Sequence, residues 1–181
     1  LKQYVKNQGG KLSVAEAFSL MEPVIEALCK VHKSGLVHRD ISPDNIMMLP
    51  EGRVKLLDFG AVRDVGDADA SQPLTKSTEA ILKQGYAPIE QYQNRGSLGP
   101  WTDVYALCAT IYFCLTGEVP PDAPERLLGD EEIDFKGLVP ELSDRQVKAL
   151  GKGMELRAQE RIASMDELHQ KLYLDEAEED T

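Results

Sequence analysis

Apolar residues recur every three or four positions between residues 14 and 33, which is the spacing of one face of an α-helix. The members of this stripe are Phe18, Met21, Ile25 and Leu28. Ser13 precedes the stripe, and Glu16 stands three positions after Ser13. This capping-box pattern marks a helix start. Gly35 supplies a stop signal. The pattern therefore predicts a helix over residues 14–33 with one buried face.

Two short apolar segments follow at residues 46–49 and 53–57, and a Pro-Glu-Gly turn signal separates them. This arrangement predicts a β-hairpin. Residues 58–90 are mostly polar and show no strong period, which is typical of a long loop that is functional or mobile.

Residues 103–115 are apolar on nearly every side, which predicts a buried central helix that ends at Gly117. Two more capping boxes, Ser143 with Gln146 and Ser164 with Glu167, predict two C-terminal helices. The predicted fold class is mainly α, an α+β domain with one small hairpin.

Composition supports a folded core and excludes several protein classes. Hydrophobic residues make up 42% of the 181 positions, which is enough to bury a core. No apolar run reaches the roughly 18 residues of a membrane span, and no secretory leader is visible. We therefore expect a cytoplasmic location, with tethering by a segment outside this chain left open. The formal net charge of −11 argues against a nucleic-acid binder.

The negative charge is concentrated in two stretches. Residues 118–145 hold nine acids and three bases, and residues 175–180 hold five acids and no base. We expect the first stretch to be a solvated surface and the second a frayed tail. The three cysteines, Cys29, Cys108 and Cys114, lie in apolar segments without a C-x-x-C pair. They are expected to be buried free thiols.

The chemistry-bearing motif is the stretch H-R-D-I-S-P-D-N at residues 38–45. Asp40 lies five positions before Asn45, and Asp58 opens a D-F-G triplet just after the second strand of the hairpin. The hairpin would place Asn45 and Asp58 side by side. A carboxylate and an amide oxygen suit a Mg²⁺ ion that bridges a polyphosphate. Asp40 would then be available to accept a proton from a hydroxyl.

With these motifs the sequence resembles the eukaryotic-type (Hanks-type) protein kinase family, in particular the C-terminal lobe of bacterial serine/threonine kinases. Residues 85–90 look like the segment that ends in A-P-E, with Ile89 in the place of the proline. Residues 101–107 look like the start of the family's central helix. The resemblance implies a kinase C-lobe over residues 1–174, an activation segment over 58–90 and an acidic tail over 175–181.

The resemblance also implies ATP as phosphoryl donor, with Mg²⁺ or, in its place, Mn²⁺. Asp40 resembles the catalytic base, and Asn45 and Asp58 resemble the metal and cofactor ligands. Met47 is expected to form the floor under the adenine ring. Phe59, followed by Gly60, belongs to the D-F-G motif.

Further structural roles follow from the same resemblance. His38 and Phe59 look like members of the family's stacked apolar spine. Asp103 resembles the carboxylate that holds the backbone of the catalytic loop. Glu90 and Arg161 look like the buried ion pair that pins the end of the activation segment.

Arg39 precedes the catalytic Asp, an arrangement that in this family accompanies control by activation-loop phosphorylation. A phosphate on a hydroxyl of that loop would pair with Arg39 and order the loop. The candidate phosphosites are Thr75, Ser77 and Thr78, with Ser71 considered beside them. The alternative is that these hydroxyls only solvate the loop.

Two positions depart from the family pattern. The family carries Lys two residues after the catalytic Asp, where this chain has Ser42. The family carries Thr three residues before the Tyr of the docking loop, where this chain has Lys83. We interpret the pair as a swap, in which Lys83 supplies the charge that stabilises the γ-phosphoryl group. The alternative is an exposed lysine beside a weakened active site.

No Gly-rich loop and no V-A-I-K-type lysine precede Leu1. This polypeptide alone is therefore expected not to be a competent kinase. The face that the family's N-terminal lobe covers is expected to be open to self-association. The expected function of the intact domain is phosphoryl transfer from ATP to Ser or Thr hydroxyls of a protein substrate.

Two alternative functions remain open from the sequence. One is a pseudokinase module that binds partners without phosphotransfer, which Ser42 favours. The other is a small-molecule kinase of related fold, against which Glu90, Asp103 and Arg161 argue together.

Overall fold

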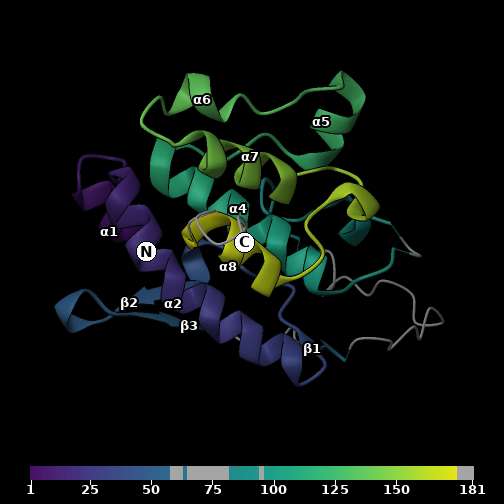
Figure 1. Cartoon of the computed structure of the whole chain (residues 1–181), viewed down its shortest axis with the longest axis horizontal. Helices are drawn as coiled ribbons and strands as arrows, with labels where there is room; N and C mark the ends of the chain where they lie inside the picture. Colours follow the sequence, from purple (N-terminus) through teal and green to yellow (C-terminus); the bar gives the residue numbers. More distant parts are fainter. Residues whose placement is uncertain (58–62, 65–81, 94–95, 175–181) are drawn as a thin grey trace, which may run out of the picture.

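The computed structural model describes residues 1–57, 82–93 and 96–174, together with the backbone of residues 63–64. Within them the fold is mainly helical, as predicted, and holds two small antiparallel strand pairs (Figure 1). The helices are α1 (Lys2–Asn7), α2 (Val14–Lys33), α4 (Pro100–Thr116), α5 (Ala123–Gly129), α6 (Phe135–Leu138), α7 (Asp144–Gly153) and α8 (Met165–Tyr173). Short 3-10 turns lie at Pro43–Asn45, Pro50–Gly52, Ile89–Gln91 and Ala158–Glu160.

Helix α2 has the bounds that the sequence predicts. The Ser13 hydroxyl accepts a hydrogen bond from the backbone N–H of Glu16 at 3.2 Å, which satisfies one of the free donors at the helix start. The Glu16 carboxylate accepts from the hydroxyl of Tyr4. At the other end Gly35 takes a φ of +83° just beyond the helix. The apolar stripe of α2 is buried.

Helix α4 is the centre of the fold and contacts α2, α7 and α8 (Figure 1). It begins at Pro100, earlier than the predicted start at Asp103, because proline suits the first turn of a helix, where its missing N–H costs nothing. Gly117 ends the helix at a φ of +77°. A Cβ at Gly117 would lie 2.1 Å from the carbonyl oxygen of Gly10, so only glycine fits there.

The predicted hairpin consists of β2 (Ile46–Met48) and β3 (Val54–Leu56), which pair antiparallel with Met47 opposite Lys55. A second pair was not predicted: β1 (Leu36–Val37) pairs with β4 (Arg63–Asp64). The segment 58–90 is thus not loop throughout, since two-residue strands are too short to show an alternation in the sequence. These strands fix both ends of the motif at residues 38–45.

Both C-terminal helices begin as predicted. Before α7, the Ser143 hydroxyl accepts from the Gln146 N–H at 3.1 Å, and Gln146 Oε1 accepts from the Ser143 N–H at 2.9 Å. Before α8, the Ser164 hydroxyl accepts from the Glu167 N–H at 3.1 Å. The short helices α1, α5 and α6 were not predicted, because few turns give too little period to detect.

The acids of residues 118–145 lie at the surface, as expected, except for the half-buried Asp122, but the stretch as a whole is not only surface. Arg126 of α5 is buried, and its guanidinium donates to the Met154 carbonyl at 2.8 Å and to the Tyr105 hydroxyl at 3.1 Å. Phe135 and Leu142 are also buried. The stretch therefore carries a buried anchor and part of the apolar core beneath its exposed acids.

The three cysteines are buried, as predicted. Loss of hydration on burial raises the pKa of the Cys108 and Cys114 thiols to about 12, and that of Cys29 to about 11. Among the described residues no helix has the length and apolar character that a membrane crossing needs.

We expect Cys108 and Cys114 to resist iodoacetamide at pH 8 in the folded protein, because the thiolate is the reactive form and both thiols stay protonated there. In guanidinium chloride both should react readily. Peptide mass mapping after a timed reaction checks this. Labelling of Cys108 in the folded protein at the rate seen in denaturant would contradict the burial described here.

Candidate active site

Asp103, on the first turns of α4, anchors the backbone of the motif at residues 38–45. Its carboxylate is fully buried; Oδ2 accepts from the His38 N–H at 2.8 Å and Oδ1 from the Arg39 N–H at 2.9 Å. His32 Nε2 lies 2.7 Å from the same Oδ2. Arg39 has a φ of +71°, a left-handed conformation that is unfavourable for a side chain of this size. The carboxylate thus stabilises a strained turn just before Asp40.

His38 connects this turn to the end of the hairpin. The Asp40 N–H donates to His38 Nδ1 at 3.2 Å, so Nδ1 acts as the acceptor and Nε2 carries the proton. His38 Nε2 then donates to the Leu57 carbonyl at 3.1 Å. The imidazole is fully buried. It therefore connects the backbone of Asp40 to Leu57, the residue that precedes Asp58.

Asn45 holds the Asp40 side chain in place. Asn45 Nδ2 donates to the Asp40 carbonyl at 2.7 Å and to Asp40 Oδ2 at 2.9 Å. The Leu57 N–H donates to the Asn45 carbonyl at 2.7 Å. One amide group therefore fixes both the backbone and the carboxylate of Asp40, next to the end of β3.

Lys83 reaches this carboxylate from a different part of the chain. Its Nζ lies 3.5 Å from Asp40 Oδ1 and donates to the Ser42 hydroxyl at 2.9 Å. Asp44 Oδ2 lies 4.0 Å from the same Nζ. Ser42 is fully buried, whereas the Lys83 side chain is 32% exposed. The structure thus brings together the two positions at which the sequence departs from the family pattern.

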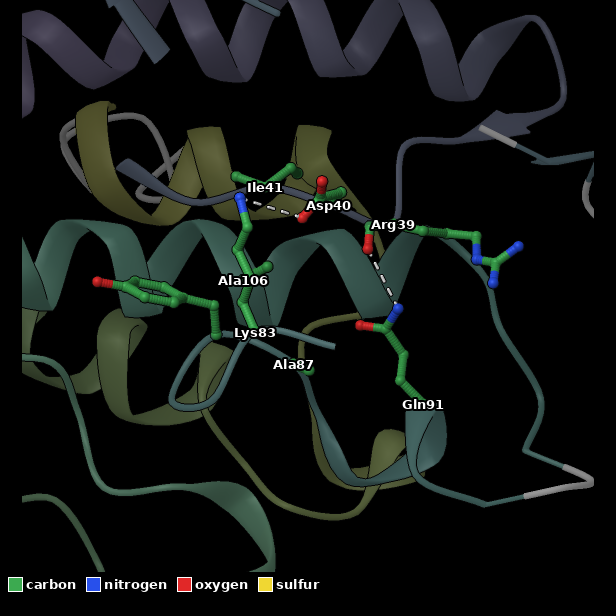
Figure 2. A pocket seen from close by; sticks show the side chains of 8 residues that line it. Arg39, Asp40, Ile41, Lys83, Ala87, Gln91 and Ala106 are labelled. Atoms are coloured by element: carbon green, nitrogen blue, oxygen red, sulfur yellow. Dashed lines mark hydrogen bonds and ion pairs between the residues drawn. The ribbon is translucent and has the colours of Figure 1, made fainter. Parts of the chain in front are cut away.

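A small pocket lies between the motif and the segment that carries Lys83, and Figure 2 shows the side chains that line it. The Lys83 side chain extends across the pocket to Asp40. Gln91 Nε2 donates to the Arg39 carbonyl at 3.2 Å and so joins the two segments on the other side. The Arg39 side chain extends away from Asp40 (Figure 2).

Glu90 and Arg161 form a buried, two-pronged ion pair. Arg161 Nη1 donates to Glu90 Oε1 at 2.6 Å, and Nη2 donates to Oε2 at 3.2 Å. The Arg161 guanidinium also donates to the backbone carbonyls of Trp101, Glu155 and Leu156. The pair ties the 3-10 turn Ile89–Gln91 to the segment between α7 and α8.

The remaining predicted site residues fall into two groups. Met47, on β2, is 45% exposed, so its side chain is available to a ligand. Outside the described residues lie Asp58, Phe59 and Gly60 of the D-F-G triplet, Ser71, and the candidate phosphosites Thr75, Ser77 and Thr78.

Sequence reasoning missed two residues of the site. His32 lies in the last turn of α2, and its contact with Asp103 spans 71 positions of the chain. Gln91 directly follows Glu90, but its hydrogen bond to Arg39 spans 52 positions. The position of His32 in the last turn of a helix, where basic residues are favoured, is the feature of the sequence that points to it. That position does not indicate which residue His32 contacts.

Comparison with known proteins gives consistent results. The family model described as "Protein kinase domain" matches residues 1–171. The chain is 28% identical to serine/threonine-protein kinase D of Synechocystis sp. over 170 residues, which cover 92% of the chain and 33% of that protein. It is 40% identical to serine/threonine-protein kinase PknL of Mycobacterium tuberculosis over 103 residues, 56% of the chain and 24% of that protein.

A solved structure titled "PpkA-294 apo form" is similar over 95% of the chain and 59% of its own length, with 32% identity and a TM-score of 0.79. The chain thus spans about a quarter to a third of the two curated relatives named above. The residues that the family model matches include the motif at residues 38–45, the central helix α4, Glu90 and Arg161.

Proposed function

Because this chain belongs to the protein kinase family and has the fold of the C-terminal lobe of a bacterial Hanks-type kinase, we propose that the protein transfers the γ-phosphoryl group of ATP to Ser or Thr hydroxyls of protein substrates. The observation that carries the proposal is the placement of the Asp40 carboxylate. Oδ2 is held by Asn45, and Oδ1 faces Lys83 in the pocket of Figure 2.

In this proposal Asp40 orients the substrate hydroxyl and accepts its proton as the oxygen attacks the γ-phosphorus. The new bond joins the hydroxyl oxygen to phosphorus. The bond from phosphorus to the bridging oxygen breaks, and ADP leaves with its electron pair. Asn45 keeps the carboxylate in place, so little reorganisation is needed at the moment of transfer.

Asn45 and Asp58 are proposed to hold Mg²⁺, or Mn²⁺ in its place. The donor set at Asn45 fits, because its Nδ2 is engaged by Asp40 and its oxygen is left as the ligand atom. When bound, the ion neutralises charge on the phosphates. The exposed Met47 side chain supports its proposed place under the adenine ring. We further propose that an N-terminal lobe covers the face that carries Met47 in the full-length protein.

Arg39 is proposed to bind a phosphate carried by Thr75, Ser77 or Thr78. In support, its side chain extends away from Asp40, so a phosphate there would leave the substrate hydroxyl's position open (Figure 2). A phosphate supplies oxygens that a guanidinium binds with two parallel hydrogen bonds.

The test is intact-mass analysis of the full-length protein after incubation with Mg²⁺ and ATP, beside an Asp40→Asn variant. We expect phosphate additions in the unchanged protein and their loss in the variant, because Asn cannot accept the hydroxyl proton. Mapping the additions tests the three candidate hydroxyls. Equal phosphorylation of both proteins would contradict the role of Asp40.

ATP binding without any phosphate addition would favour the second candidate function, a binding module without phosphotransfer. The observation behind this candidate is Ser42, a buried neutral residue where the family carries a lysine.

A further inference from the structure

The ammonium of Lys83 lies inside a cluster of acceptors. Its Nζ is 2.9 Å from Ser42 Oγ, 3.5 Å from Asp40 Oδ1 and 4.0 Å from Asp44 Oδ2. Two carboxylates therefore surround one cation. The Lys83 side chain is 32% exposed and runs along the pocket rather than out to solvent (Figure 2). A surface lysine without a role would gain more hydration, and more rotamer freedom, by extending into water.

We propose that Lys83 is a catalytic residue of the phosphoryl transfer: its ammonium binds the γ-phosphoryl oxygens and stabilises the charge that they carry in the transition state. The inference rests on the proposed function and adds to it the source of the cation. An ammonium placed beside the catalytic carboxylate lies where the hydroxyl and the phosphoryl group must meet. Ser42 offers a hydroxyl there and no charge. Within the described part of the chain, the positive charge that contacts the Asp40 carboxylate is the ammonium of Lys83.

The backbone of Lys83 is fixed by a tight turn. The Lys83 carbonyl accepts from the N–H groups of Tyr86 and Ala87, each at 3.1 Å. Gly85, inside the turn, takes a φ of +87°. A Cβ at Gly85 would lie 2.4 Å from Val119 Cγ1 and 2.8 Å from the Pro120 carbonyl oxygen. The turn therefore packs directly against the connection between α4 and α5.

Asp122 stabilises the same turn through its carboxylate. Its Oδ1 accepts from the Gly85 N–H at 3.1 Å and from the Tyr92 hydroxyl at 2.8 Å. The catalytic base and the cation thus come from two separate segments, held by different anchors. Asp103 positions the segment of Asp40, and Asp122 positions that of Lys83. It follows that the cation reaches the phosphoryl group when the end of the activation segment is docked, which couples that docking to the chemistry.

Two alternative roles of Lys83 predict different results. If Lys83 merely neutralised Asp40 and blocked it as a base, then removal of the ammonium would raise the rate. If Lys83 only stabilised the fold, then its removal would lower the thermal unfolding midpoint together with the rate.

The experiment measures the rate of phosphate incorporation at saturating Mg²⁺ and ATP, and the half-saturating ATP concentration, in the full-length protein. Four proteins are compared: the unchanged protein, Lys83→Thr, the double variant Lys83→Thr with Ser42→Lys, and Lys148→Met. Lys148 is an exposed lysine on α7 and serves as the matched control. Thermal unfolding of each is recorded in parallel.

We expect Lys83→Thr to lower the saturated rate at least about tenfold, with little change in half-saturation or in unfolding midpoint, because the ammonium acts on the transition state. The double variant should recover much of the rate, since a cation returns to the vicinity of the Asp40 and Asp44 carboxylates. Lys148→Met should behave as the unchanged protein.

Three results would overturn the inference. They are a rate for Lys83→Thr equal to or above that of the unchanged protein, a rate loss that merely follows a lower unfolding midpoint, and a double variant no more active than Lys83→Thr. These results are distinct from failure of the proposed function. In that case the unchanged protein, like Asp40→Asn, would incorporate no phosphate at all.

Discussion

Replacement of Arg161 by Met is expected to lower the free energy of unfolding by about 3–5 kcal/mol, because it leaves the buried Glu90 carboxylate without its partner. All five N–H groups of the Arg161 guanidinium have an acceptor: the two Glu90 oxygens and three backbone carbonyls. Its Cζ also lies 5.0 Å from the centroid of the Tyr105 ring. Methionine replaces none of these polar contacts.

Urea unfolding followed by circular dichroism and by the fluorescence of Trp101, the single tryptophan of the chain, measures the loss. The matched control is Arg157→Met. The Arg157 side chain is 75% exposed and lies 3.9 Å from Glu160, a surface pair worth about 0–1 kcal/mol. If Arg161→Met were no more destabilising than Arg157→Met, the buried pair would not be holding the two segments together.

A double-mutant cycle separates the interaction from the cost of an unpaired charge. Glu90→Leu alone should also be strongly destabilising, since it strands the guanidinium. The double variant with Arg161→Met removes both charges, so its loss should be smaller than the sum of the two single losses. Simple addition of the single effects would show that Glu90 and Arg161 act independently.

Replacement of Asp103 by Asn is the second large effect that we expect, at about 3 kcal/mol of unfolding free energy. Asn has one acceptor oxygen, which can keep the contacts of Oδ2 with His38 and His32. Its NH₂ group would then face the Arg39 N–H, donor against donor. Loss of a hydrogen bond to a charged acceptor costs about 1.5–3 kcal/mol, and the remaining bonds weaken as the charge disappears.

The same change should lower phosphate incorporation about 100-fold, because an error of about 1 Å in the position of a catalytic group can cost that much. The strained turn at Arg39, with its φ of +71°, loses its anchor immediately before Asp40. Urea unfolding and the mass assay of phosphate incorporation measure the two effects. Asp166→Asn is the control, since that side chain is 57% exposed and pairs with Lys33 at the surface. An Asp103→Asn protein with the control's activity would refute the anchoring role.

Patterns that repeat over several turns could be interpreted correctly from the sequence. The stripe of α2, the apolar run of α4 and the serine caps of α7 and α8 each involve residues close in the chain. Local hydrogen bonds and one-sided burial determine such elements. The short elements α1, α5, α6, β1 and β4 carry no comparable signal, because neighbouring elements stabilise them more than their own residues do.

The candidate site divides in the same way. The motif at residues 38–45 and its resemblance to a known family identified Asp40, Asn45 and Asp103 before any contact was seen. The partners across the fold were harder to predict: His32 on Asp103 and Gln91 on Arg39 join residues that are far apart in the chain. Side-chain hydrogen bonds of this kind depend on how helices pack, and spacing along the chain does not report it.

Sequence by itself therefore determined the family and the helical core, and it singled out Asp40 as the proposed catalytic carboxylate, because each depends on residues that act locally or in a fixed order. The family resemblance predicted that Lys83 takes the place of the lysine missing at Ser42, but only the tertiary structure showed its contacts. The Lys83 ammonium lies 2.9 Å from Ser42 Oγ and 3.5 Å from Asp40 Oδ1, although 41 positions separate Lys83 from Ser42. That contact exists because the turn after Lys83 docks on Asp122 while Asp103 holds the opposite segment. The position of the ammonium therefore depends on packing rather than on sequence order.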